Sequence, residues 1–139
     1  ASISYCYPLR RETSIRLNYK VGQVLEISRL ARRTNLICKN LMSYLISKTR
    51  KLLPKSVKCI VTFSDNTQGH TGGVYKASGF SRDGEVPPDY HYVSMSGKYH
   101  KKTIWDRAKK MKMTESDYAE KHGLIAVAHD KKTRWICQL

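Results

Sequence analysis

The feature that most constrains this fold is the run VKCIVTF at residues 57–63, which is apolar at nearly every position. A strand that faces water on one side alternates apolar and polar residues, whereas a strand buried on both faces is apolar throughout. Helical spacing predicts a helix at 34–53, before this strand. After the strand come a polar segment, 64–73, and a second predicted helix at 74–78, which ends at Gly79. This order predicts an α/β (α+β) fold with a mixed central sheet flanked by helices.

Further strands are predicted where β-branched and aromatic residues cluster, and segment 10–20 is expected to be a loop or an irregular strand. The last two apolar runs flank a polar turn, which predicts a C-terminal hairpin. Thr114 and Asp117 resemble a capping box for a short helix that ends at Gly123. The predicted strands are residues 3–7, 21–30 and 90–95, and the hairpin pair is 124–128 with 133–139.

Charge narrows the choice of partner. The chain carries 26 Lys and Arg against 11 Asp and Glu, a net charge of +15, which favours nucleic acid over neutral or cationic macromolecules. No run approaches the roughly 18 to 20 apolar residues of a membrane helix, so no membrane partner is expected. Residues 98–112 are the densest basic stretch, and they either contact DNA phosphates or form a solvated helix face. The candidate DNA-binding residues are Lys98, Lys101, Lys102, Arg107, Lys109 and Lys110, with a weaker basic cluster at Arg10, Arg11 and Arg16.

Cysteine and histidine spacing gives no sign of a metal site. The four cysteines are scattered without a C-x-x-C pair, which favours reduced thiols in a cytoplasm over a disulfide framework or a zinc site. The five histidines show no spacing typical of a metal triad. No metal ligand is therefore assigned.

The polar segment 64–73 is the candidate ligand site, because α/β proteins bind ligands where a buried strand turns into a helix. Its glycines allow a ligand to approach the backbone, and the following helix N-terminus favours an anion. Asp65, His70 and Tyr75 are the titratable residues there. The structural alternative is a helix cap, a surface histidine and a core tyrosine.

A family resemblance strengthens the functional reading. Residues 63–77, FSDNTQGHTGGVYKA, resemble the S-D-x-x-x-G-H-x-G-x-x-Y-x-A block of the phage Mom branch of the GNAT N-acetyltransferases. The segment EISRL at 26–30 is similar to a second block of that branch, and YKASGF at 75–80 resembles the general GNAT pattern Y-x-x-x-G-F. The resemblance covers roughly residues 20–97.

The resemblance implies a Mom-like enzyme that transfers a group from acetyl-CoA or another acyl-CoA to the exocyclic N6 of adenine in DNA, which protects a phage genome from restriction. It implies that Asp65 orients or deprotonates the acceptor and that Tyr75 protonates the leaving thiolate. His70 and the basic stretch are expected near DNA, in the cytoplasm of a bacterial host, and a homodimer is possible. The residues expected near the coenzyme phosphates are Arg29, Arg32, Arg33 and Asn35.

The sequence also departs from the GNAT pattern. Residues 32–37 lack the glycines of the usual pyrophosphate turn, and nothing matches the first strand and helices of the fold. The expectation is therefore one GNAT-like domain over 1–139, truncated at its N-terminus, with a basic helical insertion at about 98–123. Two alternative functions stay open: a non-catalytic nucleic-acid-binding module, or a GNAT that acylates a protein or a small amine.

Overall fold

The computed structural model describes residues 1–8 and 11–139, which form two compact units. Unit 1 comprises Ala1–Val86 and Lys132–Leu139, and unit 2 comprises Pro87–Lys131. Each unit has its own sheet and its own core, which confirms the α+β class. Arg10 lies outside the described residues, and none of the described helices is long and apolar enough to cross a membrane.

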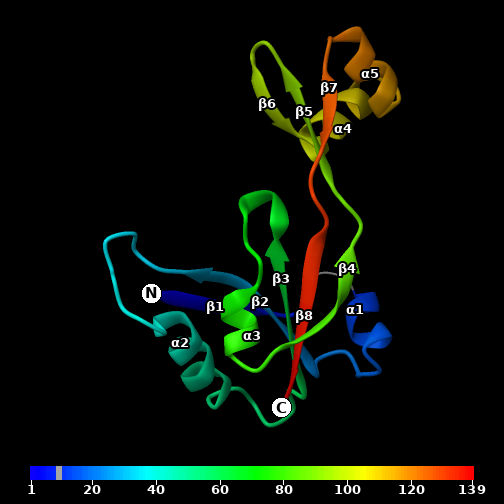
Figure 1. The fold of residues 1–139 in the computed structure, drawn as a ribbon. Helices are drawn as coiled ribbons and strands as arrows, with labels where there is room; N and C mark the ends of the chain where they lie inside the picture. The colour runs from blue at the N-terminus through cyan, green and yellow to red at the C-terminus, as the bar shows by residue number, and fades with distance from the viewer. Residues whose placement is uncertain (9–10) are drawn as a thin grey trace. The chain divides into compact units, whose positions relative to one another are not determined.

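Unit 1 is built on a five-stranded sheet in the order β1-β2-β3-β8-β4 (Figure 1). β2 and β3 are parallel to one another, and the other neighbours are antiparallel. The strands are β1 (Ser2–Cys6), β2 (Val24–Ala31), β3 (Cys59–Asp65), β4 (Ser81–Val86) and β8 (Lys132–Gln138). The helices are α1 (Arg11–Arg16), α2 (Leu41–Arg50), α3 (Gly73–Ala77) and the short 3-10 helix η1 (Asn66–Gln68).

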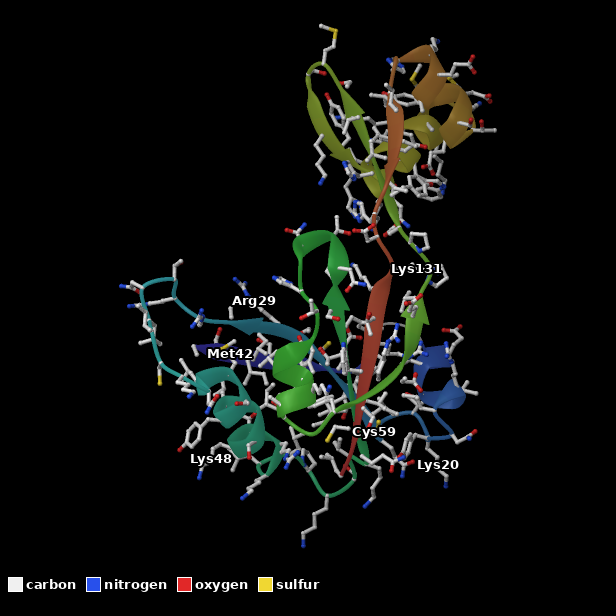
Figure 2. The ribbon with its side chains drawn as sticks, in the orientation of Figure 1. Lys20, Arg29, Met42, Lys48, Cys59 and Lys131 are labelled. Carbon is white, nitrogen blue, oxygen red and sulfur yellow. The ribbon has the colours of Figure 1, made fainter. Side chains whose placement is uncertain are left out.

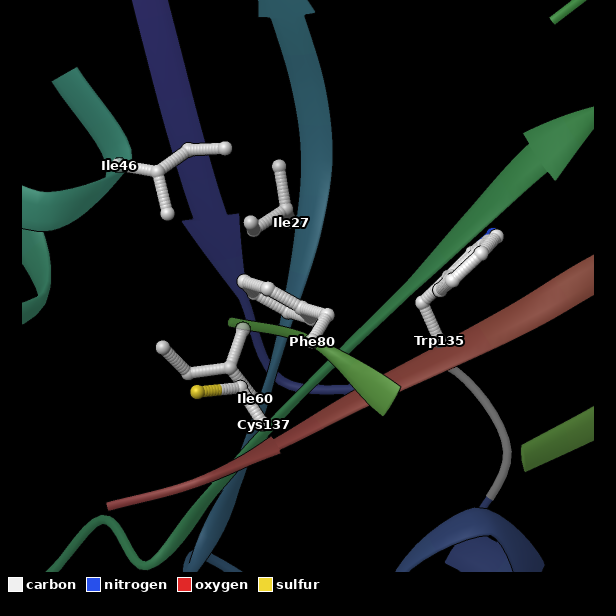
Figure 3. Packing of buried hydrophobic residues seen from close by; sticks show 6 residues of the cluster. All are labelled: Ile27, Ile46, Ile60, Phe80, Trp135 and Cys137. Atoms are coloured by element: carbon white, nitrogen blue, oxygen red, sulfur yellow. The ribbon is translucent and has the colours of Figure 1, made fainter. Parts of the chain in front are cut away.

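The apolar run is the centre of this sheet, as predicted. On one face Ile60 packs in a cluster that includes Ile46 of α2 (Figure 3). On the other face Cys59 and Val61 pack with Val24, covered by residues that follow α1. β3 is thus buried from both sides. The other members of the cluster in Figure 3 are Ile27, Phe80, Trp135 and Cys137.

The helix predicted at 34–53 begins later, at Leu41. Asn40 precedes it in the left-handed conformation, with φ of 59°, and residues 32–40 form an irregular exposed segment. Ile37 and Leu52, which lie at helical spacing within the predicted range, are both exposed. The predicted start was wrong because residues 32–40 are mostly polar, so too little apolar surface is available there to hold a helix on the sheet. The helix also ends three residues before the predicted end, at Arg50.

Two other predictions for unit 1 were incomplete. Segment 10–20 contains a helix, α1, whose Ser14 is buried, rather than a loop or an irregular strand. β4 was not predicted, because its sequence SRDGEV lacks apolar alternation. It forms because it pairs with β8, with a bulge between Arg82 and Gly84.

Unit 2 contains a three-stranded sheet in the order β6-β5-β7, with two helices. Its core is small: Tyr92, Ile104, Ala108, Tyr118 and Ala119. The elements are β5 (Tyr90–Ser94), β6 (Gly97–His100), α4 (Lys101–Lys110), α5 (Glu115–Lys121) and β7 (Ile125–Ala128).

The predicted C-terminal hairpin is wrong. β7 pairs with β5 in unit 2, whereas β8 pairs with β3 and β4 in unit 1. The polar residues between them connect two units instead of turning a hairpin. By contrast, the predicted cap is confirmed: the side-chain oxygen of Thr114 accepts a 3.1 Å hydrogen bond from the N–H of Asp117. The basic stretch is part strand and part helix, because β6 precedes α4.

Candidate functional site

The parallel strands β2 and β3 separate toward their carboxyl ends. The ladder joins only residues 24–26 of β2 to residues 59–61 of β3. Beyond these, in the part of the chain that the structure describes, β2 pairs with β1 alone and β3 with β8 alone. Peptide groups of β2 that point away from β1 therefore lack a strand partner. Unpaired peptide groups inside a sheet are costly, so such an opening is suited to an extended ligand.

A pocket of about 410 Å³ lies at this opening. Leu30 of β2 and Phe63 and Ser64 of β3 line one part of it, and residues 69–75 line another. Met42 also lines it, and Figure 2 shows this residue near the start of α2. The pocket is thus formed by the ends of two strands and the loop predicted as a ligand site.

Tyr75 is one of the residues that line this pocket. Its ring packs against Phe80 and Trp135, with centroid distances of 5.8 and 6.5 Å. Its hydroxyl hydrogen-bonds to none of the described residues. A ring fixed by packing, with an unpaired hydroxyl on a pocket wall, can exchange a proton with a ligand.

Trp135 also explains one glycine of the loop. A Cβ atom on Gly72 would lie 2.4 Å from the indole ring, and Gly72 has φ of 77°. The indole N–H donates a 3.0 Å hydrogen bond to Oγ of Ser64, which is buried at the end of β3. Only glycine at 72 lets the loop lie against this tryptophan.

The carboxylate of Asp65 is occupied within the loop. Its Oδ1 accepts a 3.0 Å hydrogen bond from the N–H of Thr67, which caps η1, and its Oδ2 lies 3.7 Å from Nζ of Lys132. Its carbonyl accepts a hydrogen bond from the N–H of His70. Asp65 does not line the pocket, whereas the exposed His70 does. The structure therefore brings His70 and Tyr75 together and leaves Asp65 outside.

The pocket continues as a groove between α2 and α3, which we call the α2–α3 groove. It opens into hollows of about 220 and 620 Å³. The first shares Met42 and Val74 with the pocket, and the second shares Asn40, Ser43 and Ala77 with the first. Since neighbouring hollows share walls, one elongated ligand can occupy the whole groove.

The start of α2 favours an anion in this groove. Asn40 makes no side-chain cap, and although the N–H of Leu41 donates to the carbonyl of Cys38, the N–H groups of Met42 and Ser43 follow it at the start of the helix and can face an anion. Arg32 lines the same hollow, and Arg50 lines the next. These groups place positive charge along the groove.

Three of the four predicted coenzyme residues, Arg32, Arg33 and Asn35, together line a neighbouring hollow of about 690 Å³ that also contacts Ala1 and Ser2. Arg29 is exposed on β2 (Figure 2). Of the four predicted residues, Arg32 is the one that lines the α2–α3 groove.

Sequence reasoning missed four residues that line the α2–α3 groove, three of them at the start of α2 and one at its end. The signal was present, because Asn40 is a favoured N-cap type directly before the apolar LMSYLI run. Thr34 is also a favoured N-cap type, and a helix capped there would begin six residues earlier. The missed residues are Asn40, Met42, Ser43 and Arg50.

Some of the predicted DNA-binding side chains of unit 2 contact other side chains of that unit, and others do not. Lys101 is engaged by Asp89, with 2.5 Å between Nζ and Oδ1, and this contact holds the pKa of Asp89 below its usual range. Lys109 lies over the Trp105 ring, and Arg107 lies over the Tyr99 ring. The exposed lysines without such a contact are Lys98, Lys102 and Lys110.

The chain was compared with models of known protein families and with curated proteins. The family model of the Mom protein family matches residues 2–139, which is nearly the whole chain. No match was found among curated proteins. Over residues 1–8 and 11–139, no three His, Cys, Asp or Glu side chains are placed to hold a metal ion together.

Proposed function

This chain belongs to the Mom protein family, and we propose that it modifies adenine in phage DNA with a group taken from an acyl-coenzyme A. Family membership suggests DNA modification. The GNAT-like fold, the acyl donor and the adenine N6 acceptor are parts of this proposal.

The observation that carries the proposal is the separation of β2 and β3 next to Tyr75. A pantetheine arm is an extended chain with amide groups, so it can pair with the free peptide groups of β2 as an added strand would. The strand order β1-β2-β3-β8-β4 supports a GNAT-like sheet, because it holds a parallel pair at the point where the opening forms.

The α2–α3 groove supports binding of the rest of the coenzyme. Its positive end at the start of α2 suits a pyrophosphate, and Arg32 adds a charge-assisted hydrogen-bond donor. This arrangement replaces the missing glycine turn: the anion would be held by an open helix N-terminus and an arginine.

A bound acyl-coenzyme A supplies an activated thioester carbonyl at the pocket. The free N–H groups of β2 would polarise that carbonyl, and the exocyclic amine of adenine would attack it. The new C–N bond forms as the C–S bond breaks, the amine loses one proton, and the sulfur gains one. Tyr75 is the residue that we assign to protonate the sulfur, because its hydroxyl is unpaired on the pocket wall.

We assign an orienting role to Asp65. Both of its carboxylate oxygens are engaged, one by Thr67 and one by Lys132, which favours a part in fixing the loop over proton abstraction. This loop carries His70 into the pocket wall, so a shift of Asp65 would move His70.

Nucleoside mass spectrometry of DNA from cells that express the protein tests this function. We expect a new adenosine species, and we expect Tyr75→Phe to lower its amount about 10²- to 10⁴-fold, the usual contribution of general acid catalysis. The thermal midpoint should not change, because the ring and its packing remain. Unmodified DNA together with intact DNA binding would instead support the alternative of a non-catalytic binding module.

Calorimetric titration of coenzyme A tests the groove. Arg32→Ala should weaken binding, while Arg33→Ala, the neighbouring arginine outside the groove, should not. Equal affinities for both variants would remove the groove from the proposal.

A further inference from the structure

The β5–β6 hairpin of unit 2 ends in an apolar residue that the fold does not explain. Met95 and Ser96 form the turn, and Gly97 follows with φ of 136°. Turns favour Gly, Asn, Asp and Ser, whose backbone or side chain suits the tight geometry, and Met offers neither advantage. The side chain of Met95 is fully exposed and does not belong to the core of unit 2. Its identity therefore contributes nothing evident to folding.

The backbone around Met95 is held firmly. The hydroxyls of Ser94 and Ser96 lie 2.8 Å apart, and Oγ of Ser94 also accepts a hydrogen bond from the N–H of Ser96. The Ser96 hydroxyl lies 2.9 Å from the hydroxyl of Tyr99, whose ring is covered by Arg107 of α4. A continuous set of contacts thus links the residues on either side of Met95 to α4.

Positive charge lies beside this apolar tip, because Lys98 is three residues from Met95 on β6, opposite Val93. Lys102 and Lys110 are exposed on α4, which follows β6 in the same unit. A partner that suits both features is anionic outside and apolar inside. Double-stranded DNA has this character, because its phosphates lie outside and its stacked bases lie within.

We infer that Met95 is a wedge that enters the base stack of double-stranded DNA. The inference rests on the proposed function in taking DNA as the substrate. Apolar side chains, Met among them, unstack base steps when they insert from a protein surface held by cations. Unstacking lowers the cost of extruding a base, which chemistry at N6 of a duplex adenine requires. A membrane fits less well, because one methionine offers little apolar surface for insertion between lipids.

Fluorescence of 2-aminopurine in a DNA duplex tests the wedge, because this base brightens when it unstacks. The full chain is compared with Met95→Ser, which removes the apolar tip, and Met95→Leu, which keeps it. Ile125→Thr is the matched control, since it changes an exposed apolar residue on β7 of the same unit. We expect a rise with the parent, with Met95→Leu and with Ile125→Thr, and an unstacked fraction about tenfold lower with Met95→Ser at saturating protein.

The affinity for duplex DNA, measured in parallel, distinguishes a failure of the Met95 wedge from a failure of the proposed DNA substrate. A parent chain that does not bind duplex DNA overturns both the wedge and the proposed DNA substrate. Binding with equal fluorescence for the parent and Met95→Ser overturns the wedge alone. The wedge is also overturned if the fluorescence rise is lost in Met95→Ser and equally lost in Met95→Leu. It is overturned as well if Met95→Ser unstacks DNA like the parent but no longer binds phosphatidylglycerol vesicles.

Discussion

Units 1 and 2 both carry a net positive charge, but they differ in its size and in which side chains carry it unpaired. Unit 1 has 17 Lys and Arg against 5 Asp and Glu, whereas unit 2 has 9 against 6. Among the acidic residues of unit 2, Asp89 pairs with Lys101, and Glu115 accepts hydrogen bonds from Tyr90 and Tyr92. Lys98, Lys102 and Lys110 stand exposed on β6 and α4. If the protein binds DNA as we propose, net charge alone favours unit 1 as the binding part, whereas the exposed lysines of β6 and α4 favour unit 2.

The two cores also differ. Unit 1 buries aliphatic side chains on both faces of β3, while unit 2 depends on one small cluster with two tyrosines. A small core leaves a unit only marginally stable. We therefore expect unit 2 to open more easily, and the predictions below test this difference in order of expected effect.

The largest effect is expected from cavities in the two cores. Ile60 and Ile104 are both fully buried, and Ile→Ala typically costs about 2–5 kcal/mol. Ile60→Ala should destabilise unit 1. Because the coenzyme A groove belongs to this unit, binding of coenzyme A should be lost at temperatures near the variant's thermal midpoint. Ile104→Ala should open unit 2 alone, seen as faster hydrogen exchange at residues 90–128 with coenzyme A affinity retained. Equal loss in both units would show that they unfold together.

The next effect concerns salt. Charge reversal of Lys98, Lys102, Lys109 and Lys110 should flatten the slope of log K for DNA against log salt by about 3 to 4, because each phosphate contact contributes about 0.9. The matched reversal in unit 1 should leave the slope nearly unchanged. If the unit 1 variant instead shows the flatter slope, the DNA phosphates are contacted by unit 1. That control set is Lys48, Lys51, Lys55 and Lys58.

A smaller effect is expected at Glu115. Its carboxylate accepts hydrogen bonds from Tyr90 at 2.7 Å and from Tyr92 at 2.9 Å. Burial, and then this hydrogen bond, raises the pKa of Tyr92 to about 12. Glu115→Gln keeps an acceptor and removes the charge, so unit 2 should lose about 1 kcal/mol, measured by denaturant unfolding. Glu120→Gln, on the exposed side of α5, should change nothing, and an equal loss there would remove the special role of Glu115.

The smallest effect has the opposite sign and lies in unit 1. Burial raises the pKa of Glu26 on β2, so its charged form is disfavoured in the folded state. A raised carboxyl pKa means that stability falls as pH rises through it. Glu26→Gln should therefore raise the thermal midpoint at pH 7 by about 2 °C or less, and the gain should vanish as pH falls below 4.5. A gain that persists in acid would exclude the charge as its cause.

Local patterns predicted the elements that depend on local chemistry. β3, α3 and the cap at Thr114 were predicted because their signals lie within a few residues of one another. β4 was missed and the pairing of β7 was wrong because both depend on partners distant in the sequence. β4 has no apolar pattern, and the hydrogen bonds of β8 make it a strand.

In the candidate site, too, features set by neighbouring residues were predicted, and features that depend on the folded chain were not. The family block predicted the loop that lines the pocket, including His70 and Tyr75. It did not predict that the carboxylate of Asp65 is turned to Thr67 and Lys132, because capping geometry depends on the folded loop. Nor did it predict that Arg32 lines both the α2–α3 groove and the hollow beside Ala1, whereas Arg33 lines the second hollow and not the groove. The irregular course of residues 32–40 places Arg32 between the two hollows.

The register of β4 and β8 has a consequence for how such a chain can change over time. The chain leaves the sheet at Val86 and returns at Lys132, and these two residues are cross-strand partners. Unit 2 therefore occupies the place of a hairpin turn. Closing so long a connection costs little more than closing a short one, since the entropic cost grows only with the logarithm of its length. Residues 87–131 can thus change in length or sequence, or be lost, without moving a strand of the five-stranded sheet.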